Sequence, residues 1–301
     1  MPPLEAVDTD QTSDRISSPF EILEPAEQTV PVVFASPHSG RDYTPGFLTE
    51  SRLDAVTLRR SEDAFVDEIF AAAPGAGAPL LRAHFPRAYV DPNREAFELD
   101  PSMFEDPLPD YVTTSSARIS AGLGTVARVV TSGEEIFGGK LRFEDARRRI
   151  ESCHIPYHRA LEALVDSTRR RFGVCLLVDC HSMPSVGGPM DSDPGRQRVD
   201  MVLGDRHGSS CAGLVTEAAE RTLRALGYQV ARNVPYAGGY TTRHYGTPGD
   251  GRHAIQIEIN RALYMNEDKV TRGNGFGELS ARMGRLIEDL LGAARQLAAA
   301  A

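Results

Sequence analysis

The sequence predicts a single α/β domain built on a mixed, mainly parallel β-sheet with helices on both faces. First, short apolar, β-branched runs alternate with longer segments of helical spacing along the 301 residues. Second, no internal repeat and no Pro/Ser-rich linker divides the chain. Third, several of the apolar runs end in polar motifs, as expected where the carboxyl ends of strands open into one crevice.

Composition excludes several classes of protein. The chain is 41% hydrophobic and 25% charged, which is close to the globular average. A formal charge of -9 argues against nucleic acid or an anionic membrane as a partner. No apolar run approaches the roughly 20 residues of a membrane helix, and the polar amino terminus has no signal-peptide pattern. The four cysteines lack CxxC spacing, so reduced thiols and a cytoplasmic location are expected.

The amino-terminal half is predicted as follows. Residues 1–16 form a flexible leader on composition, and residues 17–301 form the domain. A strand over 30–35 leads into a Pro-His-Ser-Gly turn. The other expected elements are helices over 50–60 and 62–73, the second capped by Ser61, and strands over 79–83 and 88–90.

The carboxyl-terminal half begins with a turn-rich segment, 95–139, that is more typical of a functional loop than of a scaffold. The longest helical pattern, 143–171, contains Pro156, which should kink or divide it. The other predictions are strands over 174–178, 199–203, 228–234 and 254–259, polar loops over 182–198 and 238–244, and helices over 210–226 and 276–297.

Two histidines follow predicted buried strands and are candidate metal ligands. His38 lies in the turn after the first strand, and His181 follows the strand over 174–178. A lone turn histidine is weak evidence, but two at strand ends favour a metal. Catalytic zinc commonly takes two histidines and one carboxylate and leaves one position for water. The third ligand is therefore expected to be an acid.

Asp63 and Glu62 are the candidates for that acid, and Asp63 is preferred. Both stand at the predicted start of a helix that follows the His38 strand. The alternative is that they only complement the positive end of the helix dipole. Glu258 lies between two isoleucines on the last strand, where burial beside a metal-bound water suits a general base. A structural ion pair with Arg261 or Arg252 is the alternative for Glu258.

Substrate binding is expected from an amide and several arginines. Asn93 and Arg94 stand side by side after a predicted strand and could hold a carboxylate at two points. Arg87, just upstream, could share that task or stabilise an oxyanion. Arg243 lies in the glycine-containing loop that should complete the substrate pocket.

Two other groups of residues offer rival sites. His154 and His158 have the spacing of two ligands on one helix face, but Pro156 lies between them and no glutamate follows His154, so packing and hydrogen bonding are favoured there. Cys180 adjoins His181, yet neighbours in a strand point to opposite faces and do not easily form a nucleophile-base pair.

The ordered set of motifs resembles the N-formylglutamate amidohydrolase family, over residues from about Phe20 to Asp268. The motifs are Ser36-Pro37-His38-Ser39-Gly40, Ser61-Glu62-Asp63, Val90-Asp91-Pro92-Asn93-Arg94, Asp179-Cys180-His181-Ser182-Met183-Pro184, Leu203-Gly204-Asp205-Arg206, Gly238-Gly239-Tyr240-Thr241-Thr242-Arg243-His244-Tyr245-Gly246 and Gln256-Ile257-Glu258-Ile259-Asn260-Arg261.

That family looks related to zinc carboxypeptidases and succinylglutamate desuccinylases, which implies a carboxypeptidase-like fold with one Zn²⁺ at strand ends. By this resemblance His38 and His181 match the metal histidines, the Asn93-Arg94 pair binds a substrate carboxylate, and Glu258 is the general base. The carboxypeptidase pattern has a glutamate ligand three residues after the first histidine. Arg41 stands there in this chain, and Asp63 is the expected substitute.

The resulting hypothesis is a zinc-dependent amidohydrolase that converts N-formyl-L-glutamate, or a similar N-acyl amino acid, to formate and the free amino acid. The resemblance also implies a role in histidine catabolism. A binding protein for acidic amino acids and a metal-independent hydrolase that uses Cys180 are the alternatives. The sequence leaves the acyl group, the native metal and the oligomeric state open.

Overall fold

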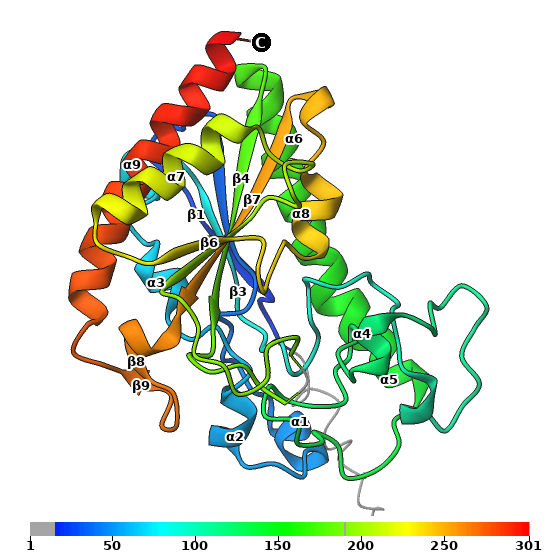
Figure 1. Ribbon diagram of the computed structural model, residues 1–301. Helices are drawn as coiled ribbons and strands as arrows, with labels where there is room; N and C mark the ends of the chain where they lie inside the picture. The colour runs from blue at the N-terminus through cyan, green and yellow to red at the C-terminus, as the bar shows by residue number, and fades with distance from the viewer. Residues whose placement is uncertain (1–15, 190, 301) are drawn as a thin grey trace, which may run out of the picture.

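A seven-stranded sheet with the strand order β1-β3-β2-β4-β7-β5-β6 forms the centre of the computed structural model, which describes residues 16–189 and 191–300 (Figure 1). The strands β3, β2, β4 and β7 are parallel, whereas β1 is antiparallel to β3 and β5 is antiparallel to β7. This confirms a mixed, mainly parallel sheet. Its strands are β1 Phe20–Leu23, β2 Val32–Ser36, β3 Leu80–Ala83, β4 Cys175–Met183, β5 Met201–Gly204, β6 Val230–Arg232 and β7 Arg252–Asn260.

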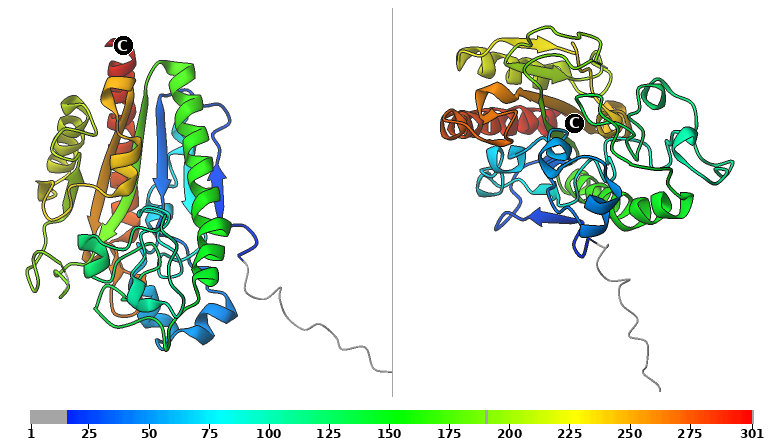
Figure 2. Two further views of the ribbon diagram at one scale, coloured as in Figure 1. Left: turned by 90° about the vertical axis from the view of Figure 1, so that its right-hand side faces the viewer. Right: turned by 90° about the horizontal axis from the view of Figure 1, so that it is seen from below.

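Helices lie on both sides of this sheet, as Figure 2 shows from two further directions. The helices of the described chain are α1 Pro45–Glu50, α2 Ala55–Arg59, α3 Val66–Ile69, α4 Ala117–Ser120, α5 Phe143–Arg149, α6 Ile155–Phe172, α7 Gly213–Ala225, α8 Tyr240–Tyr245 and α9 Phe276–Ala300. A small hairpin pairs β8 Met265–Asn266 with β9 Thr271–Arg272. None of the described helices is long and apolar enough to cross a membrane.

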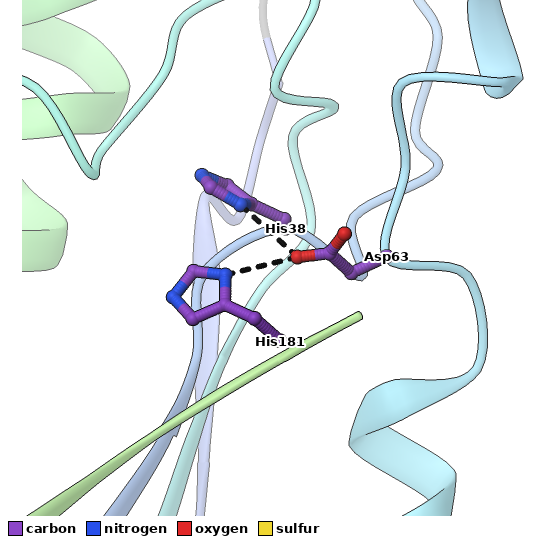
Figure 3. A group of neighbouring side chains, drawn as sticks. All are labelled: His38, Asp63 and His181. Carbon is purple, nitrogen blue, oxygen red and sulfur yellow. Dashed lines mark hydrogen bonds and ion pairs between the residues drawn. The ribbon is translucent and has the colours of Figure 1, made fainter. Parts of the chain in front are cut away.

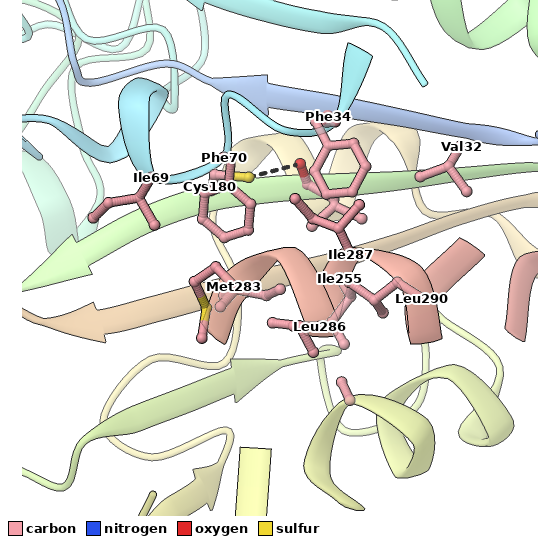
Figure 4. Packing of buried hydrophobic residues seen from close by; sticks show 14 of the residues in the cluster. Val32, Phe34, Ile69, Phe70, Cys180, Ile255, Met283, Leu286, Ile287 and Leu290 are labelled. Atoms are coloured by element: carbon pink, nitrogen blue, oxygen red, sulfur yellow. Dashed lines mark hydrogen bonds between the residues drawn. The ribbon is translucent and has the colours of Figure 1, made fainter. Parts of the chain in front are cut away.

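Each face of the sheet packs against its own hydrophobic core because side chains alternate along the strands. Val32 and Phe34 of β2 face the core that α3, α7 and α9 complete, and Figure 4 shows α9 residues packed against the strands there. Val33 and Ala35 face the opposite core, which α6 and the segments before it cover. The strands buried on both faces therefore read as continuous apolar runs.

Three of the predicted elements differ from the structure in the amino-terminal half. The helix expected over 50–60 is only α2, Ala55–Arg59, because Asp54 caps its start by accepting from Val56 N–H and Thr57 N–H. Residues 88–90 form no strand but a turn in which Tyr89 N–H donates to Pro86 O at 2.9 Å. The helix expected over 62–73 is reduced to α3, because Phe65 adopts a left-handed conformation (φ 68°) just before it. Ser61 is therefore not its cap, and the residue in the cap position is Phe65.

The long helical pattern that contains Pro156 is divided, as predicted, whereas part of the expected glycine-containing loop is helical. A π-helical turn, Ile150–His154, separates α5 from α6, and Pro156 stands in the first turn of α6, where an N–H has no partner within that helix. Residues 240–244 of the expected loop belong to the short helix α8, Tyr240–Tyr245. The predicted leader falls on residues 1–16, of which 1–15 lie outside the described residues.

Candidate metal centre

The site begins where one face of the central strands changes from apolar to polar. On β4, Cys175 and Leu177 face the core beneath α6, and Asp179 and His181 continue the same face toward the carboxyl end. The neighbouring strand β7 runs parallel to β4, and its register places Glu258 beside His181. Because β2 also neighbours β4, the loop after β2 carries His38 to the same end of the sheet.

Asp63 reaches this end through a loop rather than a helix. Its backbone N–H donates to His38 O at 3.0 Å, which ties the segment between α2 and α3 to the turn after β2. The Ser39 hydroxyl adds a second tie by donating to Asp63 O at 3.2 Å. These hydrogen bonds hold Asp63 against the His38 turn, although His38 and Asp63 are 25 positions apart in sequence.

Asp63 Oδ2 lies between the two histidines, as Figure 3 shows. It is 2.9 Å from His181 Nδ1 and 3.2 Å from His38 Nδ1, and the two ring centroids are 4.8 Å apart. All three side chains are buried, with exposures of 1–3%. Burial alone would raise the pKa of Asp63, but the hydrogen bonds and charges of both histidines outweigh it and hold the pKa well below its usual value.

A buried carboxylate holds the second nitrogen of each histidine. His38 Nε2 is 2.7 Å from Asp91 Oδ1, and His181 Nε2 is 3.0 Å from Asp179 Oδ2. A carboxylate acceptor favours the tautomer with hydrogen on Nε2 and leaves the Nδ1 lone pair free. Both Nδ1 lone pairs then face Asp63 Oδ2, at 2.9 and 3.2 Å. Lone pairs this close repel each other unless a proton or a cation lies between the nitrogen and the oxygen.

This arrangement fits a divalent metal such as zinc. Two imidazole nitrogens and a carboxylate oxygen form the usual catalytic donor set. Both Asp179 oxygens are fully buried and make no well-directed hydrogen bond, although Oδ2 is close enough to His181 for an ion pair. An anion in that position is costly unless positive charge lies nearby, which a cation held by His181 and Asp63 would supply.

The second Asp63 oxygen is held by protein. Asp63 Oδ1 accepts from Arg261 Nη2 at 3.1 Å and from the Ser182 hydroxyl at 3.2 Å, so the carboxylate is fixed in rotation with Oδ2 toward the histidines. Glu62, the other candidate ligand, instead accepts from Tyr43 and Arg59 and is not part of the cluster.

Glu258 lies beside the cluster and forms no ion pair with Arg261 or Arg252. Arg261 pairs with Asp63, and Arg252 pairs with Glu162 and Asp166. The Gln256 amide donates to Glu258 Oε1 at 2.6 Å. Burial raises the pKa of Glu258 to about 8, opposed by the charge of His181. A carboxyl group with such a pKa can accept and return a proton near neutral pH.

One cavity of about 260 Å³ brings most of the predicted site residues together: His38, Asp63, Arg87, Asn93, Arg94, His181 and Glu258 all line it. What each does there stays a prediction. Arg243 does not line this cavity. It is exposed on α8 and pairs with Glu95.

The residues from 87 to 94 form a charged wall of the cavity. Arg87 Nη2 donates to Asp91 Oδ2 at 2.8 Å, so Asp91 binds His38 with one oxygen and Arg87 with the other. Asn93 Nδ2 lies 3.3 Å from His181 Nε2, and its Oδ1 accepts from Thr241 N–H at 2.9 Å.

The rival sites have structural roles. His158 Nε2–H donates to Pro92 O at 2.7 Å and His154 Nε2–H to Arg94 O at 2.9 Å, so this pair braces the loop that carries Asn93 and Arg94. Burial lowers the pKa of His158 to about 3, which keeps it neutral. Cys180 points into the opposite core, as Figure 4 shows, and burial raises the pKa of its thiol well above the usual value.

Sequence reasoning missed the residues that support the ligands. Asp179 could have been found, because it lies two positions before His181 and so shares its strand face. Asp91 stood in a motif but had no assigned role, and Arg261 was considered only as a partner for Glu258. Their contacts join residues 53 and 198 positions apart, which no local pattern reveals.

The fold and the site together define an α/β protein with a candidate metal centre at the carboxyl edge of a mainly parallel sheet. Comparison with known families identifies the particular one. The chain belongs to the N-formylglutamate amidohydrolase family, whose family model matches residues 30–265. The family predicted from the motifs is thereby confirmed.

Similar proteins agree with this assignment. The N-formylglutamate deformylase of Pseudomonas aeruginosa is 29% identical over 255 residues, which cover 82% of this chain and 86% of the relative, and that of Pseudomonas putida is 27% identical over 251 residues, with the same two coverages. The crystal structure of N-formylglutamate amidohydrolase from Ralstonia eutropha superposes with a TM-score of 0.81 at 35% identity, and the match covers 94% of this chain and 98% of that one.

Proposed function

We propose that this protein is a metal-dependent amidohydrolase that cleaves N-formyl-L-glutamate to formate and L-glutamate. The observation that carries the proposal is the convergence of His38, Asp63 and His181 on one buried point, beside Glu258 and a cavity lined by arginines. Family membership and the deformylases named among its relatives support the same substrate.

His38, Asp63 and His181 would hold one Zn²⁺ through Nδ1, Oδ2 and Nδ1. When bound, the ion would supply a water of lowered pKa and polarise the formyl carbonyl. The chain's own contribution is to fix the three donors, through Asp91 on His38, Asp179 on His181 and the two ties to Asp63 Oδ1.

Glu258 acts as the general base in this proposal. It takes a proton from the attacking water as the water oxygen bonds to the formyl carbon. It then gives the proton to the leaving nitrogen as the C–N bond breaks. Its register beside His181 places it next to the ligand cluster, and the Gln256 amide fixes one of its oxygens.

Asn93 and Arg94 hold the α-carboxylate of the substrate and so orient the amide toward Glu258. Arg94 is buried, and two of its nitrogens are fixed by carbonyl oxygens of the chain. Arg87 adds positive charge to the same wall and either shares the carboxylate or stabilises the developing oxyanion.

A formate-release assay over a small panel of amides tests this proposal. The panel is N-formyl-L-glutamate, N-acetyl-L-glutamate and N-succinyl-L-glutamate, each followed by the release of free glutamate as well. We expect N-formyl-L-glutamate to have the highest kcat/KM. Binding of N-formyl-L-glutamate without any hydrolysis would contradict the proposal and favour a binding protein for acidic amino acids.

A further inference from the structure

Arg118, in the turn-rich segment over 95–139, lines the catalytic cavity together with Arg87, Arg94 and Arg261. It lies on α4 and is exposed, whereas Arg94 and Arg261 are buried. It therefore stands on the solvent side of the cavity. No sequence motif singled it out.

The four arginines differ in their partners. Arg87 is paired with Asp91 at 2.8 Å and Arg261 with Asp63 at 3.1 Å. Arg94 has a more distant contact with Asp91, at 3.9 Å, and donates to two backbone carbonyls. Within the described part of the chain, no carboxylate lies within ion-pairing distance of Arg118. Its guanidinium is thus available to a ligand without breaking a contact in the protein.

The backbone holds Arg118 close to Arg94. Leu123 N–H donates to Arg118 O at 2.8 Å, and Arg94 Nε donates to Leu123 O at 2.8 Å, so a single turn connects the two arginines. The Ser116 hydroxyl caps α4 by accepting from Ile119 N–H at 3.1 Å. The backbone of Arg118 is therefore held close to the Arg94 side chain.

Arg94 and Arg118 line the same cavity, and their positive charges repel each other there. Burial lowers the pKa of Arg94 to about 10, and the charge of Arg118 adds to this effect. An anion between them, or one at each, would remove the repulsion. A ligand with two carboxylates a few bonds apart suits this pair, since each guanidinium can bind one carboxylate through two parallel hydrogen bonds.

We propose that Arg118 binds the side-chain carboxylate of an N-acylated acidic amino acid while Arg94 binds its α-carboxylate. This inference rests on the proposed function, because it assumes that the substrate amide lies near Glu258. The α-carboxylate is attached to the Cα atom that bonds to the amide nitrogen, so it lies close to the amide and belongs at the buried arginine. The side-chain carboxylate is farther from the amide and belongs at the exposed one. Arg118 is then the residue that selects an acidic side chain.

The test compares two substrates that differ only in side-chain charge. N-formyl-L-glutamine has nearly the same shape as N-formyl-L-glutamate but no side-chain carboxylate. We expect Arg118→Gln to lower kcat/KM for N-formyl-L-glutamate about 10- to 100-fold, as loss of a charged hydrogen bond does. The value for N-formyl-L-glutamine should change by less than about threefold.

Two further variants serve as controls. Arg118→Lys keeps the charge and should recover part of the preference for glutamate. Arg148→Gln removes an exposed arginine on α5 that pairs with Asp145 outside the cavity, and it should leave both substrates unaffected. Thermal melting of each variant checks the fold, and the ratio of the two kcat/KM values cancels any general loss of active protein.

The possible failures are distinguishable. If the wild-type protein hydrolyses neither formyl amide, the proposed function is wrong. If the wild type prefers N-formyl-L-glutamate and Arg118→Gln lowers both substrates equally, or neither, the assignment of Arg118 is wrong while the proposed function stands. A loss confined to the glutamate substrate supports the inference.

Discussion

Asp179 gives the sharpest prediction about the support of the metal ligands. Its carboxylate is 0% exposed, and among the residues that the structure describes its one ion-pair partner is His181, at 3.0 Å. Asp179→Asn keeps the volume and still offers an oxygen to Nε2–H, but it removes the charge. Asp179→Ala removes the acceptor as well. The two variants therefore separate the effect of the charge from that of the hydrogen bond.

The expected magnitudes follow from this burial. Carboxylates behind metal histidines typically change metal affinity by about 10- to 100-fold. Asp179 is completely enclosed, so bulk solvent does not reach its position. We expect zinc affinity to fall about 10-fold in Asp179→Asn and about 100-fold in Asp179→Ala.

The assay is competition for zinc between the metal-free protein and a chelator of known affinity. Asp145→Asn, which breaks an exposed ion pair on α5, is the matched control and should bind zinc as the wild type does. Thermal melting without metal reports on the fold of each variant. Equal zinc affinity for wild type and a folded Asp179→Ala variant would refute the reasoning.

Three other predictions concern Glu258 as the base, the position of Asn93 in the cavity wall, and the thiol of Cys180. Glu258→Gln should abolish turnover yet leave zinc bound, and near-parental hydrolysis would show that the base is elsewhere. Gly239→Ala should lower kcat/KM about 10-fold or more, because an added Cβ would lie 2.3 Å from Asn93 Oδ1. Gly249→Ala meets no atom within 4 Å and should match the wild type in the same assay. Cys180→Ala should keep full formate release and lose about 1 kcal/mol of stability in denaturant unfolding; an inactive, folded variant would revive the thiol mechanism.

The central strands could be predicted from sequence because burial on both faces makes them continuous apolar runs that end in polar motifs. The same rule failed for residues 88–90. Ala88, Tyr89 and Val90 are apolar, but they are buried in a turn that packs in the core beneath α6. Helical spacing likewise gave too long a helix before residue 73, since periodicity does not reveal that Phe65 has a positive φ.

The site residues likewise fall into those that the sequence could place and those that it could not. His38, His181 and Glu258 follow from strand order, because β2, β4 and β7 are neighbours and their carboxyl ends meet. The position of Asp63 depends on a loop held to the His38 turn by a backbone hydrogen bond, which composition does not encode. Arg243 was expected near the substrate from its glycine-containing motif, but α8 turns it outward toward Glu95.

Metal content measured together with activity tests the central claim most directly. We expect about one zinc ion per chain in the wild type, loss of formate release on chelation and recovery when zinc is restored. Asp63→Ala, folded by thermal melting, should retain neither metal nor activity. Full activity of the rigorously metal-free protein, or unchanged zinc content in Asp63→Ala, would contradict the account.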